Sequence, residues 1–419
     1  MYDLVSELFP ICRSITGDGV RQTLAILQRY IPLAISEVPT GTQVFDWTIP
    51  QEWNIRDAYI KNSRGDRIVD FRHSNLHVVN YSEPIHTTMS LDDLKPHLFS
   101  NSDQPALIPY RTSYYKRAWG FCLPHEQLLA LADDQYEVCI DSTLADGNLT
   151  YAECFIPGSS EEEILFSCHV CHPSLCNDNL SGISVAAFLA REVASESRRY
   201  SYRFLFIPGT IGAITWLARN QALTSRVKHG LVLTCVGDVG GFHYKQSRRG
   251  NASIDRTMAH VLRHGVMAHE IRSFSPYGYD ERQFCSPGFD LPVGCLMRSV
   301  WGEFPQYHTS ADDLTFVRPQ ALAESLRTCV EVINVLEHDR MYRNLTPFCE
   351  PALGRRGLYA PAEGHGIGNK NLARLWVLNL SDGAHSLLDI AERSGMRFGD
   401  IHEAANDLAL NGLLEEASH

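Results

Sequence analysis

The sequence predicts an α/β protein in which a mainly parallel sheet is covered by helices, with a small inserted β domain and a C-terminal winged helix-turn-helix. Three observations predict it. Between residues 151 and 337, short apolar runs alternate with helical patterns, which is typical of a parallel sheet covered on both faces. Residues 36–121 carry short alternating runs separated by turn residues. Beyond residue 369, three short amphipathic helices follow one another.

The elements follow in chain order. Apolar residues recur at helical spacing in residues 1–35, which predicts helices there. The β-rich segment 36–121 then interrupts the main domain, which we place at 1–35 and 122–345. Its strands and helices are expected at 151–156, 163–169, 182–196, 202–207, 210–221, 229–236, 254–264, 291–297 and 316–337.

The C-terminal region is predicted to be a linker at 346–368 and a winged-helix-like domain at 369–419. Residues 371–416 hold three Arg and no Lys against eight Asp or Glu. Because phosphate binding needs a basic face, this charge argues against DNA and favours a packing or dimerisation module.

Composition restricts the class of protein further. The chain has 419 residues and a formal charge of −12, so nucleic acid is not expected as a general partner. No apolar stretch is long enough to span a membrane, and the N-terminus lacks the pattern of a signal peptide. The twelve cysteines lie mostly in apolar runs, as reduced core residues do, so we expect a cytoplasmic protein.

Polar residues stand where apolar runs end. His169 closes the run 163–167, and Asp178 precedes the helix that begins near Gly182. Asp238 and His308 follow later β-like runs. Imidazole nitrogens and carboxylates that can bridge two metals are ligand types that zinc favours, so His169, Asp178, Asp238 and His308 form a predicted metal site.

Three alternatives remain at this site. His172, three residues from His169, becomes the ligand if the strand ends later. The His and Asp side chains could instead only make hydrogen bonds in a turn. Cys168, Cys171 and Cys176 could form a thiolate zinc site with His172, but such a site needs further close ligands, and none lies nearby in sequence.

The order of these blocks resembles the zinc aminopeptidases of the bacterial leucyl aminopeptidase type, which are co-catalytic zinc exopeptidases. Their pattern contains Asp-Asn-x-Ser-Gly and Tyr-His-Thr-x-x-Asp, which match residues 178–182 and 307–312. The whole chain is similar to a bacterial group of aminopeptidase-like proteins with an inserted β domain and a C-terminal winged helix. Segments carrying this similarity include 13–19, 110–115 and 349–351.

The chain departs from the peptidase pattern at two positions. Gly209-Thr210 stands where the family has a Glu-Glu pair that supplies a base and a ligand, and Cys171 replaces an Asp that orients the first His. The resemblance then implies about one zinc per chain, held by His169, Asp178 and Asp238. Asp178 and His308 would have shared the second. Candidate carboxylates for the base are Glu303 first, then Glu281 and Asp312.

The function expected from the resemblance is zinc-dependent, aminopeptidase-like hydrolysis of an amide or peptide bond, in surface-polysaccharide or specialised metabolite biosynthesis. The alternatives are a catalytically silent metal-containing binding protein and, with less support, a winged-helix regulator. The expected partners are a small-molecule or peptide substrate and a second copy in a homo-oligomer, with no nucleic acid and no membrane.

Overall fold

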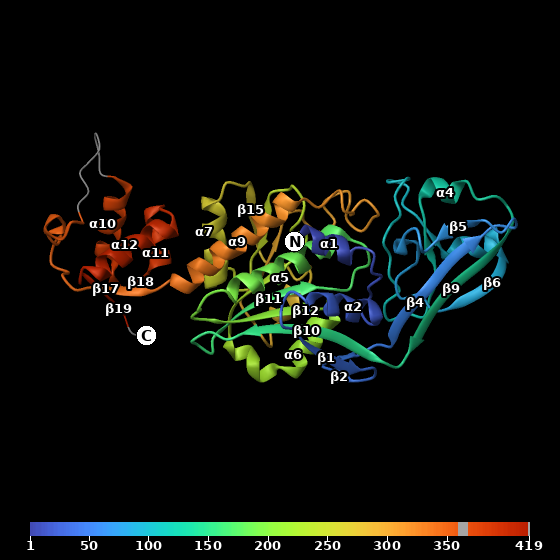
Figure 1. Cartoon of the computed structure of the whole chain (residues 1–419), viewed down its shortest axis with the longest axis horizontal. Helices are drawn as coiled ribbons and strands as arrows, with labels where there is room; N and C mark the ends of the chain where they lie inside the picture. The colour runs from blue at the N-terminus through green and yellow to red at the C-terminus, as the bar shows by residue number, and fades with distance from the viewer. Residues whose placement is uncertain (359–367, 418–419) are drawn as a thin grey trace. The chain divides into compact units, whose positions relative to one another are not determined.

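A computed structural model describes residues 1–358 and 368–417 of the chain (Figure 1). The described chain divides into two compact units. The first contains residues 1–252 and 268–327, and the second contains residues 253–267 and the chain from Thr328 onward. Each unit is described by itself below.

The first unit is built on an eight-stranded sheet. Its order is β1-β10-β12-β11-β13-β16-β14-β15, and the central strands β12, β11, β13 and β16 run parallel to one another. Antiparallel pairs join β1, β10 and β14 to this parallel core. The strands are β1 (Ala34–Pro39), β10 (Asn148–Ile156), β11 (Glu163–His169), β12 (Ser201–Ile207), β13 (Val227–Leu233), β14 (Phe242–Lys245), β15 (His269–Arg272) and β16 (Val293–Met297). The predicted α/β class with a mainly parallel sheet is confirmed.

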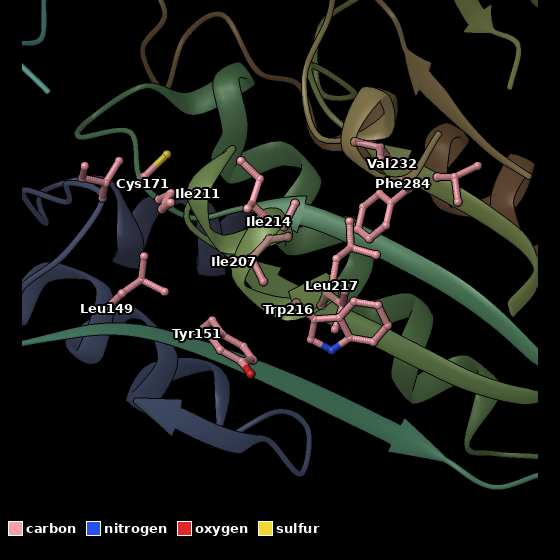
Figure 2. Close-up of a cluster of buried hydrophobic side chains, with 14 of the residues drawn as sticks. Leu149, Tyr151, Cys171, Ile207, Ile211, Ile214, Trp216, Leu217, Val232 and Phe284 are labelled. Atoms are coloured by element: carbon pink, nitrogen blue, oxygen red, sulfur yellow. The ribbon is translucent and has the colours of Figure 1, made fainter. Parts of the chain in front are cut away.

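Helices cover both faces of this sheet. Figure 1 shows α5 (Gly182–Val193) and α6 (Ile211–Arg219) on opposite faces. Two N-terminal helices, α1 (Tyr2–Leu8) and α2 (Asp18–Leu27), confirm the helical prediction for residues 1–35, and α8 is a short helix at Glu281–Phe284. Between α6 and the strands lies a core in which Trp216, Ile207 and Phe284 are fully buried (Figure 2). Apolar burial of this kind is the main stabilising contribution to such a fold.

The inserted segment forms a separate four-stranded antiparallel sheet in the order β5-β4-β9-β6. Its strands are β4 (Glu52–Lys61), β5 (Arg67–Asp70), β6 (Ile85–Ser90) and β9 (Gln135–Ala145). The small β domain is therefore present, but its sheet includes β9, beyond the boundary expected at residue 121. Strand β9 lies in the middle of the sheet, and that position depends on long-range pairing with β4 and β6. Smaller elements of this region are β2 (Gln43–Val44), β3 (Trp47–Thr48), β7 (Leu98–Phe99), β8 (Phe121–Cys122), α3 (Leu91–Leu94) and α4 (His125–Leu129).

The second unit contains the winged helix. A three-stranded sheet in the order β18-β17-β19 packs with helices α10 to α12, and a capping box joins Ser386 and Asp389 at the start of α11. The elements are α7 (Ser253–His264), β17 (Met341–Asn344), α10 (Asn369–Leu380), β18 (Asp382–Ser386), α11 (Leu387–Ser394), α12 (Phe398–Leu410) and β19 (Leu414–Glu416); α9 (Pro319–His338) begins in the first unit. Residues 359–367 of the predicted linker, and 418–419, lie outside the described residues.

None of the helices within the described ranges combines the length and the apolar character needed to cross a bilayer.

Candidate metal centre

Three loops at the carboxyl edge of the parallel strands meet around one carboxylate. Strand β11 ends at His169, which lies opposite Ile207 of β12, so the loops that follow these two strands run side by side. The loop after β11 carries His172 and leads to Asp178, just before α5. The carboxyl edge of a parallel sheet is the usual place for a functional site in α/β proteins.

Histidine nitrogens surround Asp178. His169 Nε2 lies 2.9 Å from Asp178 Oδ1, and His308 Nε2 lies 3.0 Å from Oδ2. His172 Nδ1 is 3.2 Å from the same Oδ2 and 3.3 Å from His169 Nε2. His169, His172 and Asp178 are buried and form a compact group of potential metal ligands, whereas the His308 side chain is 33% exposed. The open side of the group is therefore the His308 side.

Asp312 fixes the loop that carries Asp178. Its carboxylate accepts hydrogen bonds from the backbone N–H groups of Asn177 (2.6 Å) and Asp178 (3.0 Å). Burial raises the pKa of Asp312 to about 8, opposed by these two hydrogen bonds. The pKa of Asp178 is instead held well below its usual value by the surrounding histidines, which outweigh burial. Asp178 is therefore an anion at neutral pH, as a metal ligand must be.

The tautomer of His169 is set by its outer partner, Asn179. His169 Nδ1 lies 3.3 Å from Asn179 Nδ2, a donor, and the Asn179 side-chain oxygen is already occupied by the backbone N–H groups of Gly182 and Cys235. Nδ1 is therefore an acceptor, and Nε2 of His169 carries the proton. Burial lowers the pKa of His169 to about 4, so it is neutral. A nitrogen that carries a proton cannot bind a metal.

His172 has a partner that allows either tautomer. Its Nε2 lies 3.4 Å from the hydroxyl of Tyr279, which can donate or accept. Nδ1 of His172 lies 3.2 Å from both Asp178 Oδ2 and the Asp178 backbone carbonyl oxygen, so with Nε2 protonated its lone pair faces these oxygens and can bind a cation placed among them. The geometry therefore favours His172 over His169 as a direct ligand, with His169 donating a hydrogen bond to Asp178.

The remaining carboxylates named from sequence have other partners. Asp238 accepts hydrogen bonds from Asn177 Nδ2 (2.7 Å), from the Gly240 backbone N–H (2.6 Å) and from the Ser299 hydroxyl (2.8 Å). The structure thus places it outside the His169–His172–Asp178 group. Strand β13 ends at Leu233, five residues earlier, so Asp238 does not stand at the strand end.

Glu281 and Glu303 each form an ion pair. Fully buried Glu281 pairs with Lys245 at 2.7 Å and accepts from the Tyr279 backbone N–H at 3.0 Å. Glu303 pairs with Arg272 at 2.6 and 2.8 Å, and its side chain is 54% exposed. The hydrogen bonds from Arg272, together with its charge, lower the pKa of Glu303.

Tyr279 occupies the space beside Gly209. Its ring lies 3.9 Å from that of His169, centroid to centroid, and its hydroxyl lies 3.5 Å from Cys171 Sγ. A β-carbon added to Gly209 would come within 2.1 Å of the Tyr279 ring. The position at which the peptidase pattern carries its first Glu is therefore filled by a phenol from another segment.

The inserted segment covers the site with Tyr110. Its ring packs edge-on against His172 and His308, with centroid distances of 5.2 and 5.0 Å, and its backbone N–H donates to the His308 carbonyl at 2.7 Å. Burial raises the pKa of Tyr110 well above its ordinary value.

Sequence reasoning missed the parts played by Asn179 and Tyr279. Asn179 belonged to a recognised motif, but its role depends on which amide atom faces His169. Tyr279 lies next to the Asp280–Phe284 stretch, yet no spacing relates it to Gly209 seventy residues earlier. His172 was an open alternative, and the structure brings it into the group.

The residues present fit one zinc ion. Tetrahedral zinc with nitrogen ligands at about 2.0–2.1 Å separates its ligand atoms by about 3.3 Å. Among the three side chains that can act as ligands, Asp178 Oδ2 lies 3.2 Å from His172 Nδ1 and 3.0 Å from His308 Nε2. Imidazole nitrogens with one carboxylate are also a donor set that zinc accepts.

The fold and the composition of this site define an aminopeptidase-like protein with the zinc-exopeptidase fold and a C-terminal winged helix. A zinc aminopeptidase from Bacillus subtilis superposes with a TM-score of 0.58 at 13% identity, covering 80% of this chain and 93% of the other, which shows the fold alone.

The chain belongs to the family described as "Domain of unknown function (DUF4910)", whose model matches residues 2–339; a winged helix-turn-helix model matches residues 340–416. A Clostridium acetobutylicum protein, named as a candidate polysaccharide biosynthesis protein with an aminopeptidase-like domain, is 53% identical over 409 residues, covering 97% of this chain and 94% of that protein. A crystal structure of a candidate peptidase from Clostridium acetobutylicum has a TM-score of 0.95 at 52% identity, covering 99% and 95% of the two chains.

Proposed function

We propose that this protein is a zinc-dependent hydrolase of an amide or peptide bond. The observation that carries the proposal is the convergence of three histidine nitrogens on the ionised carboxylate of Asp178, at 2.9–3.2 Å, at the carboxyl edge of the sheet. The expected metal content is one zinc per chain, since Gly209 and Thr210 supply no carboxylate.

His172, Asp178 and His308 would hold the ion, and His169 would orient Asp178 through its Nε2–H. Zinc bound there supplies a Lewis acid that polarises a carbonyl group and activates water. Asp312 keeps the Asp178 loop in place, and Asn179 keeps His169 in the required tautomer. Asp238 would not bind this ion directly, because its oxygens accept hydrogen bonds from Asn177, Gly240 and Ser299.

Of the three carboxylates proposed as the proton acceptor, Glu303 has the best support. All three carboxylates have hydrogen-bond partners, but Glu281 and Asp312 are fully buried. Glu303 reaches solvent and is kept ionised by Arg272. The Tyr279 phenol, whose pKa is raised by burial, stays protonated and can donate a hydrogen bond beside His172 but cannot accept a proton at neutral pH.

The name of the Clostridium relative supports a substrate class. Because that protein is described as a candidate polysaccharide biosynthesis protein, we propose an amide on a surface-sugar precursor as the substrate. All twelve cysteines are free thiols, which supports a reducing, cytoplasmic setting.

The first test measures zinc by mass spectrometry after dialysis against buffered zinc. His172→Ala should lose stoichiometric zinc, whereas His169→Gln should keep it with affinity lowered about 10–100-fold, as for loss of an outer partner. His269→Ala, on the exposed strand β15, is the matched control. Equal zinc loss in His169→Gln and His172→Ala would refute the tautomer argument, and full retention in Asp178→Ala would refute the site.

The second test screens aminoacyl and N-acyl amides, including N-acylated amino sugars, for zinc-dependent turnover. If Glu303 accepts the proton, Glu303→Gln should lower turnover by about a hundredfold or more while keeping zinc. An unchanged rate in a zinc-loaded Glu303→Gln would remove Glu303 from the mechanism.

One observation favours a second candidate function, a catalytically silent zinc-binding protein. Tyr279 fills the place where the related peptidases carry their base, and the ring blocks any side chain at Gly209. A protein that binds one zinc but turns over no amide in the screen would support this candidate. Zinc-dependent turnover of any tested amide would exclude it.

A further inference from the structure

A cavity of about 630 Å³ lies in the first unit, apart from the candidate metal centre. Its lining includes none of the side chains around Asp178. Three stretches of chain form its walls: the loop and helix from Phe9 to Gln22, the start of β4, and the loop from Phe71 to Leu76. The volume falls within the range of about 300–1,000 Å³ typical of small-molecule sites.

A buried polar atom at the cavity lacks a partner. Asn75, which lines it, is 9% exposed, and its side-chain oxygen makes no hydrogen bond within the described chain. Its amide nitrogen makes only a long bond of 3.5 Å to the Pro10 carbonyl. Buried acceptors without a donor are rare because desolvation is costly, so a ligand hydroxyl or amine would relieve this one.

The lining carries two arginines, Arg56 and Arg72, and one carboxylate, Asp18, which pairs with Arg21. Arg56 pairs with Asp141, so Arg72 is the arginine left for a ligand. The Arg72 side chain donates one bond, of 3.0 Å, to Asp57, and Asp57 is already held by both terminal nitrogens of Arg67 at 2.8 and 3.2 Å. Arg72 is 68% exposed, and among the described residues no other acceptor bonds to its guanidinium. His73 lines the cavity next to it. Arginine forks of this kind bind carboxylate and phosphate groups well.

The rest of the lining suits a hydroxylated ligand. Gln22, Asn54 and Ser74 contribute amide and hydroxyl groups, and the half-buried rings of Phe9 and Phe71 contribute apolar surface. Asn54 and Ser74 already have partners within the chain, so the Asn75 oxygen is the buried group that a purely apolar ligand would leave unpaired.

We propose that this cavity binds a small hydroxylated anion, a sugar acid or a sugar phosphate, with a hydroxyl donating to Asn75 and the anionic group on Arg72. This ligand site is separate from the zinc-dependent hydrolysis proposed above.

The cavity shares a wall with the metal centre. Ser174 and Ser310, each two residues beyond a histidine of the site, line the cavity. Leu76 also lines it and packs on Tyr110, whose ring in turn packs edge-on against His172 and His308. A ligand here would therefore lie next to the loops of the metal centre without reaching Asp178.

The test is isothermal titration calorimetry on the full chain with glucuronate, glucose 1-phosphate, glucose and inorganic phosphate. Glucuronate or glucose 1-phosphate should bind with a dissociation constant below about 1 mM. The tighter binder of the two shows whether the site prefers a carboxylate or a phosphate. Arg72→Gln and Asn75→Ala should each weaken that binding at least tenfold. Arg64→Gln, which alters an exposed arginine in the turn between β4 and β5 that does not line the cavity, is the matched control and should leave binding unchanged.

Two controls separate this site from the proposed metal centre. Binding should persist in chelator-treated protein, and binding that requires zinc would overturn the assignment. Binding of neither sugar anion, or affinity unchanged in both Arg72→Gln and Asn75→Ala, would also overturn it. Equal affinity for inorganic phosphate and glucose 1-phosphate would contradict the recognition of ligand hydroxyls. Because the Arg72 side chain is exposed, Arg72→Gln should fold normally even if Asn75→Ala disturbs the packing around Asn75.

Discussion

Replacing Gly209 by alanine should destabilise the first unit, because Tyr279 stands where the methyl group must go. The new carbon would lie 2.1 Å from one ring carbon of Tyr279 and 2.6 Å from its hydroxyl oxygen. The ring cannot swing away freely, since it packs on His169 and its hydroxyl contacts Cys171 and His172. Overpacking at such a site costs about 1–3 kcal/mol.

The expected shift in melting temperature follows from the size of the unit. A unit of roughly 300 residues has an unfolding entropy of about 0.6 kcal/mol/K, so this cost corresponds to about 2–5 °C. Differential scanning calorimetry of the zinc-loaded full chain measures the shift. An alanine that fits its site usually stabilises by about 0.4–1 kcal/mol, because it restricts the unfolded chain.

Gly288→Ala is the matched control, since an added β-carbon there has no neighbour within 4 Å. It should leave the melting temperature unchanged or slightly raised. In a Tyr279→Ala background the cost of Gly209→Ala should largely disappear, giving a coupling of about 1–3 kcal/mol. An equal loss in both backgrounds, or a Gly209→Ala protein as stable as the parent, would refute the view that Tyr279 fills this space.

Arg203 binds Glu163 through two nitrogens, at 2.7 and 2.9 Å, and the glutamate side chain is 1% exposed. Arg203→Met should therefore lower the free energy of unfolding by about 3–5 kcal/mol in chemical denaturation, because it leaves the buried Glu163 charge without a partner. A cost below 1 kcal/mol would contradict this. Burial lowers the pKa of His229 from 6.5 to about 4, so the folded chain binds fewer protons than the unfolded chain in that window, and stability falls as the pH drops from 6.5 to 4. His229→Phe should flatten this fall in urea titrations at pH 7 and 5, and an unchanged slope would contradict the assignment. The winged helix should show no salt-sensitive shift of duplex DNA in a gel at physiological ionic strength, since α12 exposes Asp400 and Glu403; submicromolar binding would refute this.

The sequence by itself determined the elements and their class. The alternation of apolar runs and helical patterns between residues 151 and 337 predicted β11, α5, β12 and α6 to within a few residues. Such patterns are local, because strand and helix periodicity can be read from neighbouring residues. The same local reading placed His169, Asp178 and His308 at element ends, and these side chains meet in the structure.

Tertiary structure decided what depends on distant segments. Strand β9 belongs to the inserted sheet only because β4 and β6 pair with its two edges. Asp238 looked like a strand-end ligand, but Ser299, sixty-one residues later, holds its carboxylate.

The choice between His169 and His172 depends on contacts of single atoms. Asn179 presents a donor to His169, and Tyr279 presents a hydroxyl to His172 while filling the space beside Gly209. The spacing of residues in the sequence does not predict which atom of the Asn179 amide faces His169, or that the Tyr279 ring fills the space beside Gly209. Those contacts form only when the strand order brings separate loops to one edge of the sheet.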